Sequence, residues 1–554
     1  MKNKSTYLAW ALIALPIIFY FYFLSEYSLN IPKWDDHALK AFILEFENAN
    51  GFLAKFQTFF KQHNEHRIAF DRLITLIVFK IHGAIDYRWL MWVGNFTLIG
   101  TVFFFYKIFQ KQKAALWFFV PVPFILFQLQ LWENTFWGMA ALQNFGIFFF
   151  IYGLIYLISS EKKTHFYVAI LFAFFATYTS GNGITVFPIC IVLLLLQRRF
   201  KETFIFGITS ILLIFAYFYH YQMPPSNPPM IGIGLGKIIV GFFSFLGSAF
   251  DLMPNSSGRI KLTIVSGGIL FMISAIIAIY LIFNSKLLKK NRFLNQTELF
   301  VLGSLMFLIG TAVVVTFTRI SFGDVGLLTS RYKIYAILLL ITLYIFIISK
   351  IELINLKRLV FPLILLSVGF NVIANYINFK EVVNFRNQLI SFAINWKLEP
   401  ENQKNTNNII LYETPKLEIE NQISNIKKSI KLSPIVFKKI LKSEINNGVL
   451  IQSRTGRKYA PMLSARTDYF IIVQSSKRTY LIPSQLINYP VTVFLRKLQY
   501  WEHGFDAQLD KNEFENGTYQ LGLLTKYDKN IETYYLNDSL IVNNTKPRNV
   551  KTNW

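Results

Sequence analysis

The chain opens its first apolar run with Tyr7-Leu-Ala-Trp-Ala-Leu-Ile-Ala-Leu-Pro16 and continues it to Tyr27. An apolar run of about 20 residues is long enough to cross a bilayer as a helix. Trp34-Asp35-Asp36-His37 follows it, and the segment from there to Arg72 gathers acidic, basic and histidine side chains. Ionisable groups collected beside a membrane segment are the first place to look for chemistry. We therefore expect an anchoring first helix followed by a functional loop.

The composition is that of a polytopic membrane protein. Of the 554 residues, 53% are hydrophobic and 16% are charged, against roughly 25% charged in soluble domains. The formal net charge is +25, but Lys and Arg occur in short clusters between apolar runs, as from Arg198 to Lys201 and from Lys286 to Arg292. Basic residues in alternate loops mark the cytoplasmic side. The charge therefore indicates topology, and we expect no nucleic-acid partner.

Counting crossings between the basic clusters predicts about 11 transmembrane helices, with the N-terminus cytoplasmic and the C-terminus outside. The predicted crossings are 7–27, 89–109, 116–131, 145–158, 166–178, 184–196, 203–219, 263–283, 298–317, 332–348 and 359–376. The loop after the first crossing is predicted to hold amphipathic helices at 38–49 and 52–61. The segment from Arg67 to His82 is polar and short. Because the count of crossings between the basic clusters leaves no room for another one here, this segment is expected to lie along the outer membrane face. The segment from Gly236 to Phe250 predicts an interfacial or re-entrant helix.

The composition changes near Asn378, where Asn, Lys, Glu and Ser become frequent and the long apolar runs end. The predicted organisation is a transmembrane domain (1–380), a helix and linker (381–407) and a small β-rich extracytoplasmic domain (408–554). Strands are predicted at 408–412, 469–473, 518–524 and 539–542, where turn signals punctuate short apolar runs. The single cysteine, Cys190, excludes an intrachain disulfide and a thiolate metal cluster.

The acidic pair Asp35 and Asp36 provides the first candidates for catalysis. Successive side chains of an extended chain point to opposite faces, so one carboxylate can face a substrate while the other holds a metal, an arginine or the loop. A carboxylate that is partly desolvated at the membrane edge is a better general base. Asp36 also suits the N-cap of the helix after it, so two interpretations of this residue stay open.

A second polar cluster, Gln62-His63-Asn64-Glu65-His66-Arg67, offers hydrogen bonds to a polar substrate and a cation to a phosphate. His63 and His66 are three residues apart and lack the helical His-Glu-x-x-His spacing of zinc proteases. A solvated helix start is the other interpretation. Arg67 and Asp71, four residues apart, also suit a pair on one helix face.

Arg319 and Arg331 border a predicted outer loop, against the positive-inside trend. Arginine binds phosphate oxygens in a bidentate manner, so these two residues and Tyr332 are candidates for binding a lipid-linked phosphate. Snorkelling to lipid headgroups and pairing with Asp324 are the alternatives. The run from Trp132 to Trp137 contains Glu133 and fits both an aromatic belt and a sugar-binding surface.

These features resemble the GT-C superfamily of integral-membrane glycosyltransferases, which includes protein mannosyltransferases, the oligosaccharyltransferase catalytic subunit and lipid A aminoarabinose transferases. The family pattern is a first span, an outer loop with an acidic pair, and a juxtamembrane helix that begins at a polar motif and ends near a glycine. Trp34-Asp35-Asp36-His37 and the segment from His63 to Gly83 match this pattern. Asn64-Glu65-His66-Arg67 stands where mannosyltransferases have His-Pro-Pro-Leu. The resemblance covers roughly residues 1–376.

The resemblance implies transfer of a sugar from a polyprenyl-phosphate donor to a glycan, lipid or protein acceptor on the outer face of a bacterial inner (cytoplasmic) membrane. Asp35 or Asp36 would activate the acceptor hydroxyl, Arg67, Arg319 or Arg331 would stabilise the leaving phosphate, and Glu65 and His66 would line a sugar. Some relatives need a divalent cation, and Asp35, Asp36 and Glu65 have the oxygen ligands that Mg²⁺ or Mn²⁺ prefers.

Three other functions remain as alternatives. The first is an envelope polysaccharide polymerase or ligase, and the second is a transporter or flippase of lipid-linked sugars. The third is a non-enzymatic assembly protein. Coupled transporters carry buried charges in broken helices at the membrane midplane, whereas the predicted span centres here are nearly free of charge.

Overall fold

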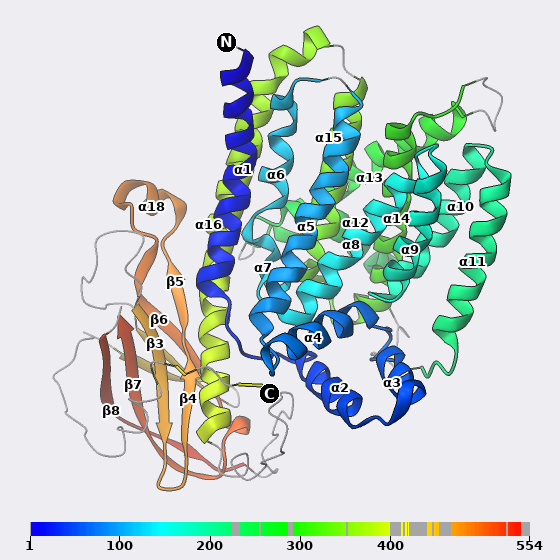
Figure 1. Ribbon diagram of the computed structural model, residues 1–554. Coiled ribbons are helices and arrows are strands. Elements are labelled where there is room, and N and C mark those ends of the chain that lie inside the picture. Colours follow the sequence, from blue (N-terminus) through cyan, green and yellow to red (C-terminus); the bar gives the residue numbers. More distant parts are fainter. Residues whose placement is uncertain are drawn as a thin grey trace. The chain divides into compact units, whose positions relative to one another are not determined.

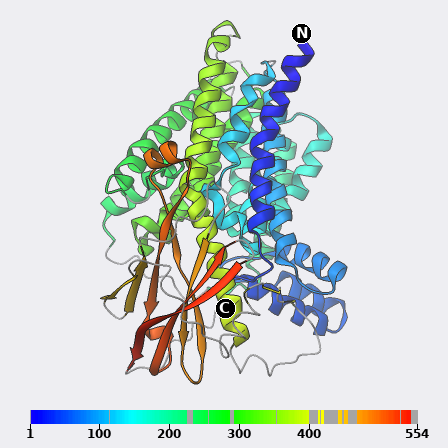
Figure 2. The same cartoon turned by 90° about the vertical axis from the view of Figure 1, so that its left-hand side faces the viewer.

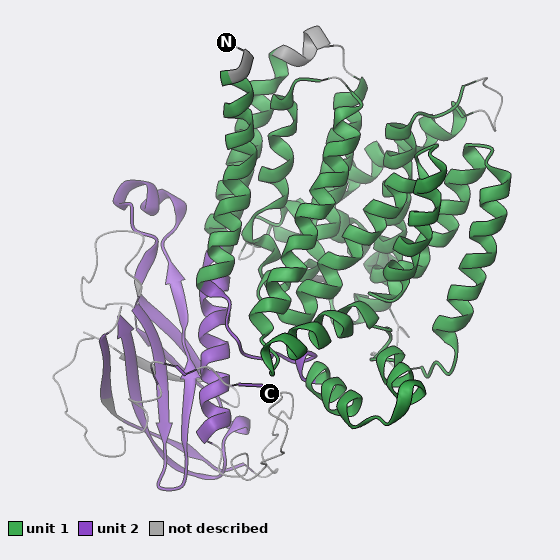
Figure 3. Cartoon of the chain, viewed as in Figure 1, with its two compact units in different colours: residues 1–26, 38–378 green, residues 27–37, 379–554 purple. Residues whose placement is uncertain are grey.

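The chain folds into two compact units (Figure 3). Unit 1 comprises Met1–Glu26 and Ala38–Asn378, and unit 2 comprises Tyr27–His37 and Phe379–Trp554. The segment Tyr27–His37, which the sequence analysis assigned to the first domain, belongs to unit 2. The computed structural model describes residues 2–112, 114–223, 233–253, 256–285, 292–350, 353–398, 412–413, 416–417, 419, 440–445, 448–453, 467–527 and 530–544.

Unit 1 is α-helical (Figure 1). Its long helices, of which α1, α2 and α16 continue into unit 2, are α1 (Lys2–Tyr27), α2 (Asp36–Asn48), α3 (Gly51–Phe60), α4 (Ala69–His82), α5 (Tyr87–Gln110), α8 (Gly138–Ile158), α9 (Lys163–Thr177), α10 (Val186–Leu196), α11 (Phe200–Phe218), α12 (Leu235–Leu246), α13 (Arg259–Phe283), α14 (Gln296–Arg319), α15 (Lys333–Lys350) and α16 (Leu353–Leu398). Its short helices are η1 (Leu116–Phe119), α6 (Pro121–Leu126), η2 (Leu129–Leu131), α7 (Trp132–Thr135), η3 (Gly181–Thr185), η4 (Ser248–Phe250), η5 (Ile320–Phe322), η6 (Asp324–Leu328) and η7 (Ser330–Tyr332).

Within the described residues, nine helices are long and apolar enough to cross a membrane, whereas the sequence predicted about 11. The count differs because α9 has 15 residues and α10 has 11. At 1.5 Å per residue even α9 reaches only about 22 Å, short of a hydrocarbon core of about 30 Å. The predicted interfacial helix at 236–250 is α12, which is also short and apolar. The long helices fit a multi-pass membrane protein.

The helices of unit 1 pack closely where glycine removes a side chain. A Cβ atom on Gly94 of α5 would lie 2.3 Å from the backbone carbon of Ala141 in α8. A Cβ atom on Gly267 of α13 would lie 1.8 Å from the carbonyl oxygen of Phe243 in α12. Larger residues at these two positions would push the helix pairs apart.

The predicted crossing 116–131 is interrupted in the structure. Pro121 and Pro123 lie in α6, and the chain becomes extended at Gln128, with φ −155° and ψ 163°. Proline removes a backbone donor, and the freed carbonyls need other partners inside a membrane. The Asn371 side chain of α16 donates to the carbonyls of Phe124 (2.7 Å) and Phe127 (2.9 Å). Hydrogen bonds from α16 therefore stabilise the interruption.

Unit 2 contains two four-stranded antiparallel sheets. The first has the order β1 (Ile440–Ile445), β2 (Gly448–Ser453), β6 (Trp501–Asp510), β5 (Gln485–Asn488). The second has the order β4 (Thr479–Pro483), β3 (Thr467–Gln474), β7 (Gly517–Tyr527), β8 (Asn530–Val542). Two short helices, α18 (Val491–Lys497) and η9 (Lys511–Glu513), lie between strands.

The two sheets pack face to face, and the last part of α16 covers the second sheet (Figure 2). Ile471 and Val473 of β3 join a core with Phe505 of β6, while Phe470 and Ile472 pack with Ile390 of α16. This alternation follows from the two-residue period of a strand. The predicted strands 469–473, 518–524 and 539–542 fall within β3, β7 and β8, and all of 408–412 except Tyr412 lies outside the described residues.

Candidate functional site

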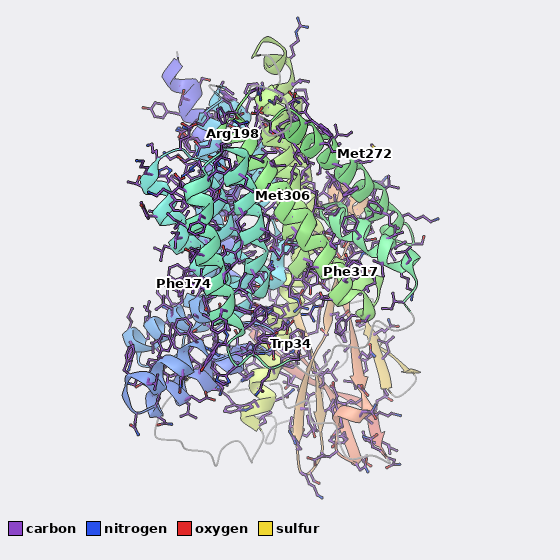
Figure 4. All side chains as sticks on the ribbon, turned by 90° about the vertical axis from the view of Figure 1, so that its right-hand side faces the viewer. Trp34, Phe174, Arg198, Met272, Met306 and Phe317 are labelled. Atoms are coloured by element: carbon purple, nitrogen blue, oxygen red, sulfur yellow. The ribbon has the colours of Figure 1, made fainter. Side chains whose placement is uncertain are left out.

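At one end of unit 1, α5 and α15 begin, α14 ends and α2–α4 lie (Figure 1). We call it the polar end, because charged side chains pair there. Ion pairs and a contact between Glu65 and His66 connect eight of its side chains, which are Glu65, His66, Glu133, Asp251, Arg259, Arg319, Arg331 and Lys333. Figure 4 shows Phe174 and Phe317 towards this end, Arg198 at the opposite end and Met306 between them. The topology prediction assigns the polar end to the outer side.

Glu65 and Arg319 form an ion pair that joins the loop before α4 to the end of α14. The Glu65 Oε1 atom also lies 3.9 Å from His66 Nε2. His66 Nδ1 accepts the Gly181 N–H at 3.0 Å, so the proton of the neutral ring lies on Nε2, towards Glu65. Burial raises the pKa of Glu65, but His66 and Arg319 outweigh burial and hold it below its ordinary value. The Arg319 side chain is 29% exposed and remains within reach of a ligand.

Arg67 has a different role from the one that the sequence suggested. Its guanidinium group donates to the backbone carbonyls of Phe60, Tyr217 and Tyr219, and the residue is buried. Arg72 donates to the carbonyls of Phe59, at 2.9 Å, and Lys61. A helix end leaves unpaired carbonyls; the two arginines bind those at the end of α3, and Arg67 also binds those at the end of α11. Arg67 is thus occupied by protein groups, which does not suit a phosphate ligand.

The structure brings together Glu133 and Arg331, which are far apart in the sequence. Arg331 Nε lies 3.6 Å from Glu133 Oε1, and the guanidinium group is 5.6 Å from the centre of the Trp137 ring. The Arg331 carbonyl accepts the Asn134 side chain at 3.0 Å, and the Glu133 N–H donates to Ser330 Oγ at 3.1 Å. The Arg331 side chain is 32% exposed. Tyr332 packs its ring 6.0 Å from that of Phe245.

A second ion cluster of the polar end was missed by the sequence analysis. The buried Asp251 carboxylate accepts two hydrogen bonds from Arg259, both 2.7 Å, and lies 2.9 Å from Lys333 Nζ. Burial raises the pKa of Asp251, but Arg259 and Lys333 lower it below its ordinary value. Arg259 and Lys333 begin helices at the predicted outer side, just as Arg331 borders one. Arg331 was selected because it borders a helix at the outer side against the positive-inside trend. The same criterion would have selected Arg259 and Lys333.

Two buried glutamines lie at the interruption of the span 116–135. Gln128 Oε1 accepts the Gln130 N–H at 2.6 Å, and Gln130 Nε2 donates to the Ala249 carbonyl at 3.1 Å. The Gln128 Nε2 donor and the Gln130 Oε1 acceptor have no hydrogen-bond partner within the described residues. Buried amides without a partner are rare in folded proteins, so this interruption offers a donor and an acceptor to a polar ligand.

The acidic pair lies in unit 2 and forms a tight turn rather than an extended strand. Asp36 begins α2 and is buried, its Oδ2 accepting the Lys33 N–H at 2.9 Å while its own N–H donates to the Lys33 carbonyl at 2.9 Å. Asp36 therefore holds the turn. Trp34 has φ +43°, a left-handed conformation that costs a non-glycine residue about 1 kcal/mol or more. Trp34 is exposed and Asp35 is half-buried, so this turn presents a ring beside a carboxylate.

Lys33 shapes the same turn. Its Nζ atom lies 4.3 Å from the centre of the Trp34 ring and 4.1 Å from that of Phe385. A cation between two aromatic faces is attracted by both ring quadrupoles. This contact fixes the orientation of the Trp34 ring next to Asp35.

The described residues contain no group of three His, Cys, Asp or Glu side chains that would bind a metal ion. The Glu65 carboxylate pairs with Arg319, and the Asp36 carboxylate holds the Lys33 backbone. Glu65 and Asp36 are therefore each held by protein groups, which does not fit the role of magnesium or manganese ligands that the resemblance implied.

Comparisons of the chain with protein-family models, with curated proteins and with solved structures find no match.

Proposed function

We propose that the protein is a membrane glycosyltransferase of the GT-C type, which transfers a sugar from a polyprenyl-phosphate donor to a cell-envelope acceptor on the extracytoplasmic face. The observation that carries the proposal is the pair of partly exposed arginines at the polar end. Arg319 pairs with Glu65, Arg331 lies beside Glu133, and the two arginine side chains are 29% and 32% exposed. An arginine held in this way binds phosphate oxygens without first losing much side-chain freedom.

The charge balance of the polar end also favours an anionic ligand. Four cationic side chains, Arg259, Lys333, Arg319 and Arg331, face three carboxylates, Asp251, Glu65 and Glu133. Asp251 pairs with two of these cations, Arg259 and Lys333. Cations outnumber carboxylates by one in this set of ion pairs, and a phosphate at the polar end would add a negative charge to it.

In the proposed reaction the acceptor hydroxyl oxygen attacks the anomeric carbon of the donor sugar. The bond between that carbon and the phosphate oxygen breaks, and polyprenyl phosphate leaves with the electron pair. The resemblance implies that Asp35 takes the hydroxyl proton. For Arg319 and Arg331 we propose that they stabilise the charge that develops on the phosphate. Asp36 maintains the turn that presents Asp35, and the exposed Trp34 ring offers a stacking surface to a sugar.

The test is release of polyprenyl phosphate from synthetic polyprenyl-phosphate sugars by the purified full chain in nanodiscs, with an envelope-glycan acceptor. We expect Asp35→Asn to lower the rate at least about 100-fold, the scale of a general base. Arg319→Gln and Arg331→Gln are each expected to lower it by roughly 100-fold. Arg88→Gln is the matched control, because Arg88 pairs with Asp86 in the same loop region and is 54% exposed. Full activity in both Asp35→Asn and Asp36→Asn would refute the catalytic assignment.

One observation favours a second candidate, a transporter or flippase of lipid-linked sugars. The interrupted span with Gln128 and Gln130 is the kind of broken helix around which transporters build binding sites. The assay for a transporter or flippase is movement of a fluorescent lipid-linked sugar between the leaflets of proteoliposomes. If this candidate is right, Asp35→Asn would leave that movement intact, whereas Gln128→Leu and Gln130→Leu would abolish it. Measuring both assays on the same preparations separates the two candidates.

A further inference from the structure

The short helix α18 (Val491–Lys497) carries an exposed apolar stripe. Val491, Leu495 and the following Leu498 are 46%, 68% and 66% exposed. They are spaced by four and three residues, so they share one face of the helical turn. Three large apolar side chains on so short a segment form a surface that water solvates poorly.

The same segment is basic. Arg496 and Lys497 are exposed in its last turn, and the stretch from Tyr489 to Tyr500 contains no acidic residue. Lys497 Nζ lies 5.1 Å from the centre of the Tyr489 ring. Apolar, aromatic and basic side chains together are typical of peptide segments that lie in the interface of an anionic bilayer.

Contacts within unit 2 connect α18 to the ends of two membrane-crossing helices. The Phe494 ring of α18 lies 6.5 Å from that of Tyr500, and the Tyr500 ring lies 5.2 Å from that of Phe379 in α16. The Tyr500 hydroxyl accepts the Lys380 N–H at 3.1 Å. Phe379 in turn contacts Tyr27, 5.6 Å between rings, and Tyr27 ends the candidate span Lys4–Tyr27.

The length of α16 indicates where this helix leaves the membrane. Its apolar segment Arg358–Leu398 has 41 residues and would extend about 60 Å, twice a hydrocarbon core of about 30 Å. Ile390 and Ile394 are buried against the second sheet of unit 2, so the C-terminal part lies outside the bilayer. Phe379 therefore lies near the membrane exit, and α18 projects from the end of unit 2 where its part of α16 begins (Figure 3).

We propose that α18 is a membrane-interface anchor of unit 2 that binds an anionic lipid surface. Val491, Leu495 and Leu498 insert below the headgroups, and Arg496 and Lys497 bind lipid phosphates. The cations together with the nearby membrane exits favour a lipid surface over a second copy of the chain. The anchor holds unit 2 at the bilayer through a contact separate from the α16 linkage.

The test uses the full chain in nanodiscs with Cys190→Ser, so that Leu495→Cys carries the only thiol for an environment-sensitive fluorophore. Asn512→Cys is the matched control, because Asn512 is exposed in η9 at the far end of β6, about 30 Å from Trp501. We expect lipids with nitroxide groups near the headgroup to quench the label at 495 and to leave the label at 512 unchanged.

Lipid charge supplies the second measurement. In nanodiscs with anionic lipid, Arg496→Gln and Lys497→Gln are each expected to lower the ratio of inserted to free α18 about fivefold. Equal quenching at 495 and 512, or quenching at 495 that is insensitive to lipid charge and to both substitutions, would overturn the proposal. Disulfide formation between two copies through Leu495→Cys, without lipid quenching, would show that a second copy covers this face instead.

Discussion

Single residues of this protein divide between those that are buried among protein groups and those that stay partly exposed. Arg67 and Arg319 border the same polar end, yet Arg67 is buried with three backbone carbonyls while Arg319 is partly exposed beside Glu65. Asp36 and Asp35 show the same contrast, since the first closes a turn and the second is half-buried. The sequence shows which side chains are present, but only the fold decides which of them are buried and which stay partly exposed.

Arg67→Lys is expected to destabilise unit 1 by about 3 kcal/mol, because the single nitrogen of lysine cannot reach three carbonyls that bind three different nitrogens of the guanidinium group. Each lost hydrogen bond from a charged donor costs about 1.5 kcal/mol or more. Thermal unfolding followed by tryptophan fluorescence in detergent measures the shift. Arg88→Lys is the control, since an exposed pair contributes about 1 kcal/mol or less. Equal shifts for the two variants would contradict a structural role for Arg67.

At the scale of elements, regular segments could be predicted and interruptions could not. The first loop has helices at Asp36–Asn48 and Gly51–Phe60, close to the predicted 38–49 and 52–61, because amphipathic periodicity is a local property. Pro121 and Pro123 were visible in the sequence, yet the break at 127–128 depends on Asn371, which lies far along the chain. The ion pairs Glu65–Arg319 and Glu133–Arg331 are non-local in the same way, so their residues could be nominated but not paired.

Asn371→Ala is expected to cost about 2–4 kcal/mol of stability, because two backbone carbonyls of the interrupted span would lose their donor in an apolar surrounding. Asn378→Ala is the matched control on the same helix. The Asn378 side chain donates to the Ala374 carbonyl one turn earlier in its own helix, so its loss is expected to cost under about 1 kcal/mol. If Asn378→Ala were the more damaging change, Asn371 would not support the interruption.

The whole molecule combines a helical unit with a sandwich that includes the last part of α16 as a third layer. The basic clusters between apolar runs predict one orientation, with the N-terminus cytoplasmic and the polar end and unit 2 outside. Within the described residues, nine helices are long and apolar enough to cross a membrane, which agrees with a multi-pass protein in either orientation. Orientation therefore needs its own measurement.

Three single-cysteine variants in a Cys190→Ser background provide that measurement. His82→Cys lies at the end of α4, Asn512→Cys in unit 2 and Lys201→Cys in a basic cluster at the other end of unit 1, and all three positions are exposed. A membrane-impermeant maleimide is expected to label the first two in intact bacterial cells and the third only after lysis. Helix α4 is the sharpest case: at 14 residues it spans about 21 Å, too short for a hydrocarbon core of about 30 Å. Labelling of His82→Cys only after lysis would mean that α4 crosses the membrane, and it would remove the outer placement of the polar end on which the glycosyltransferase proposal depends.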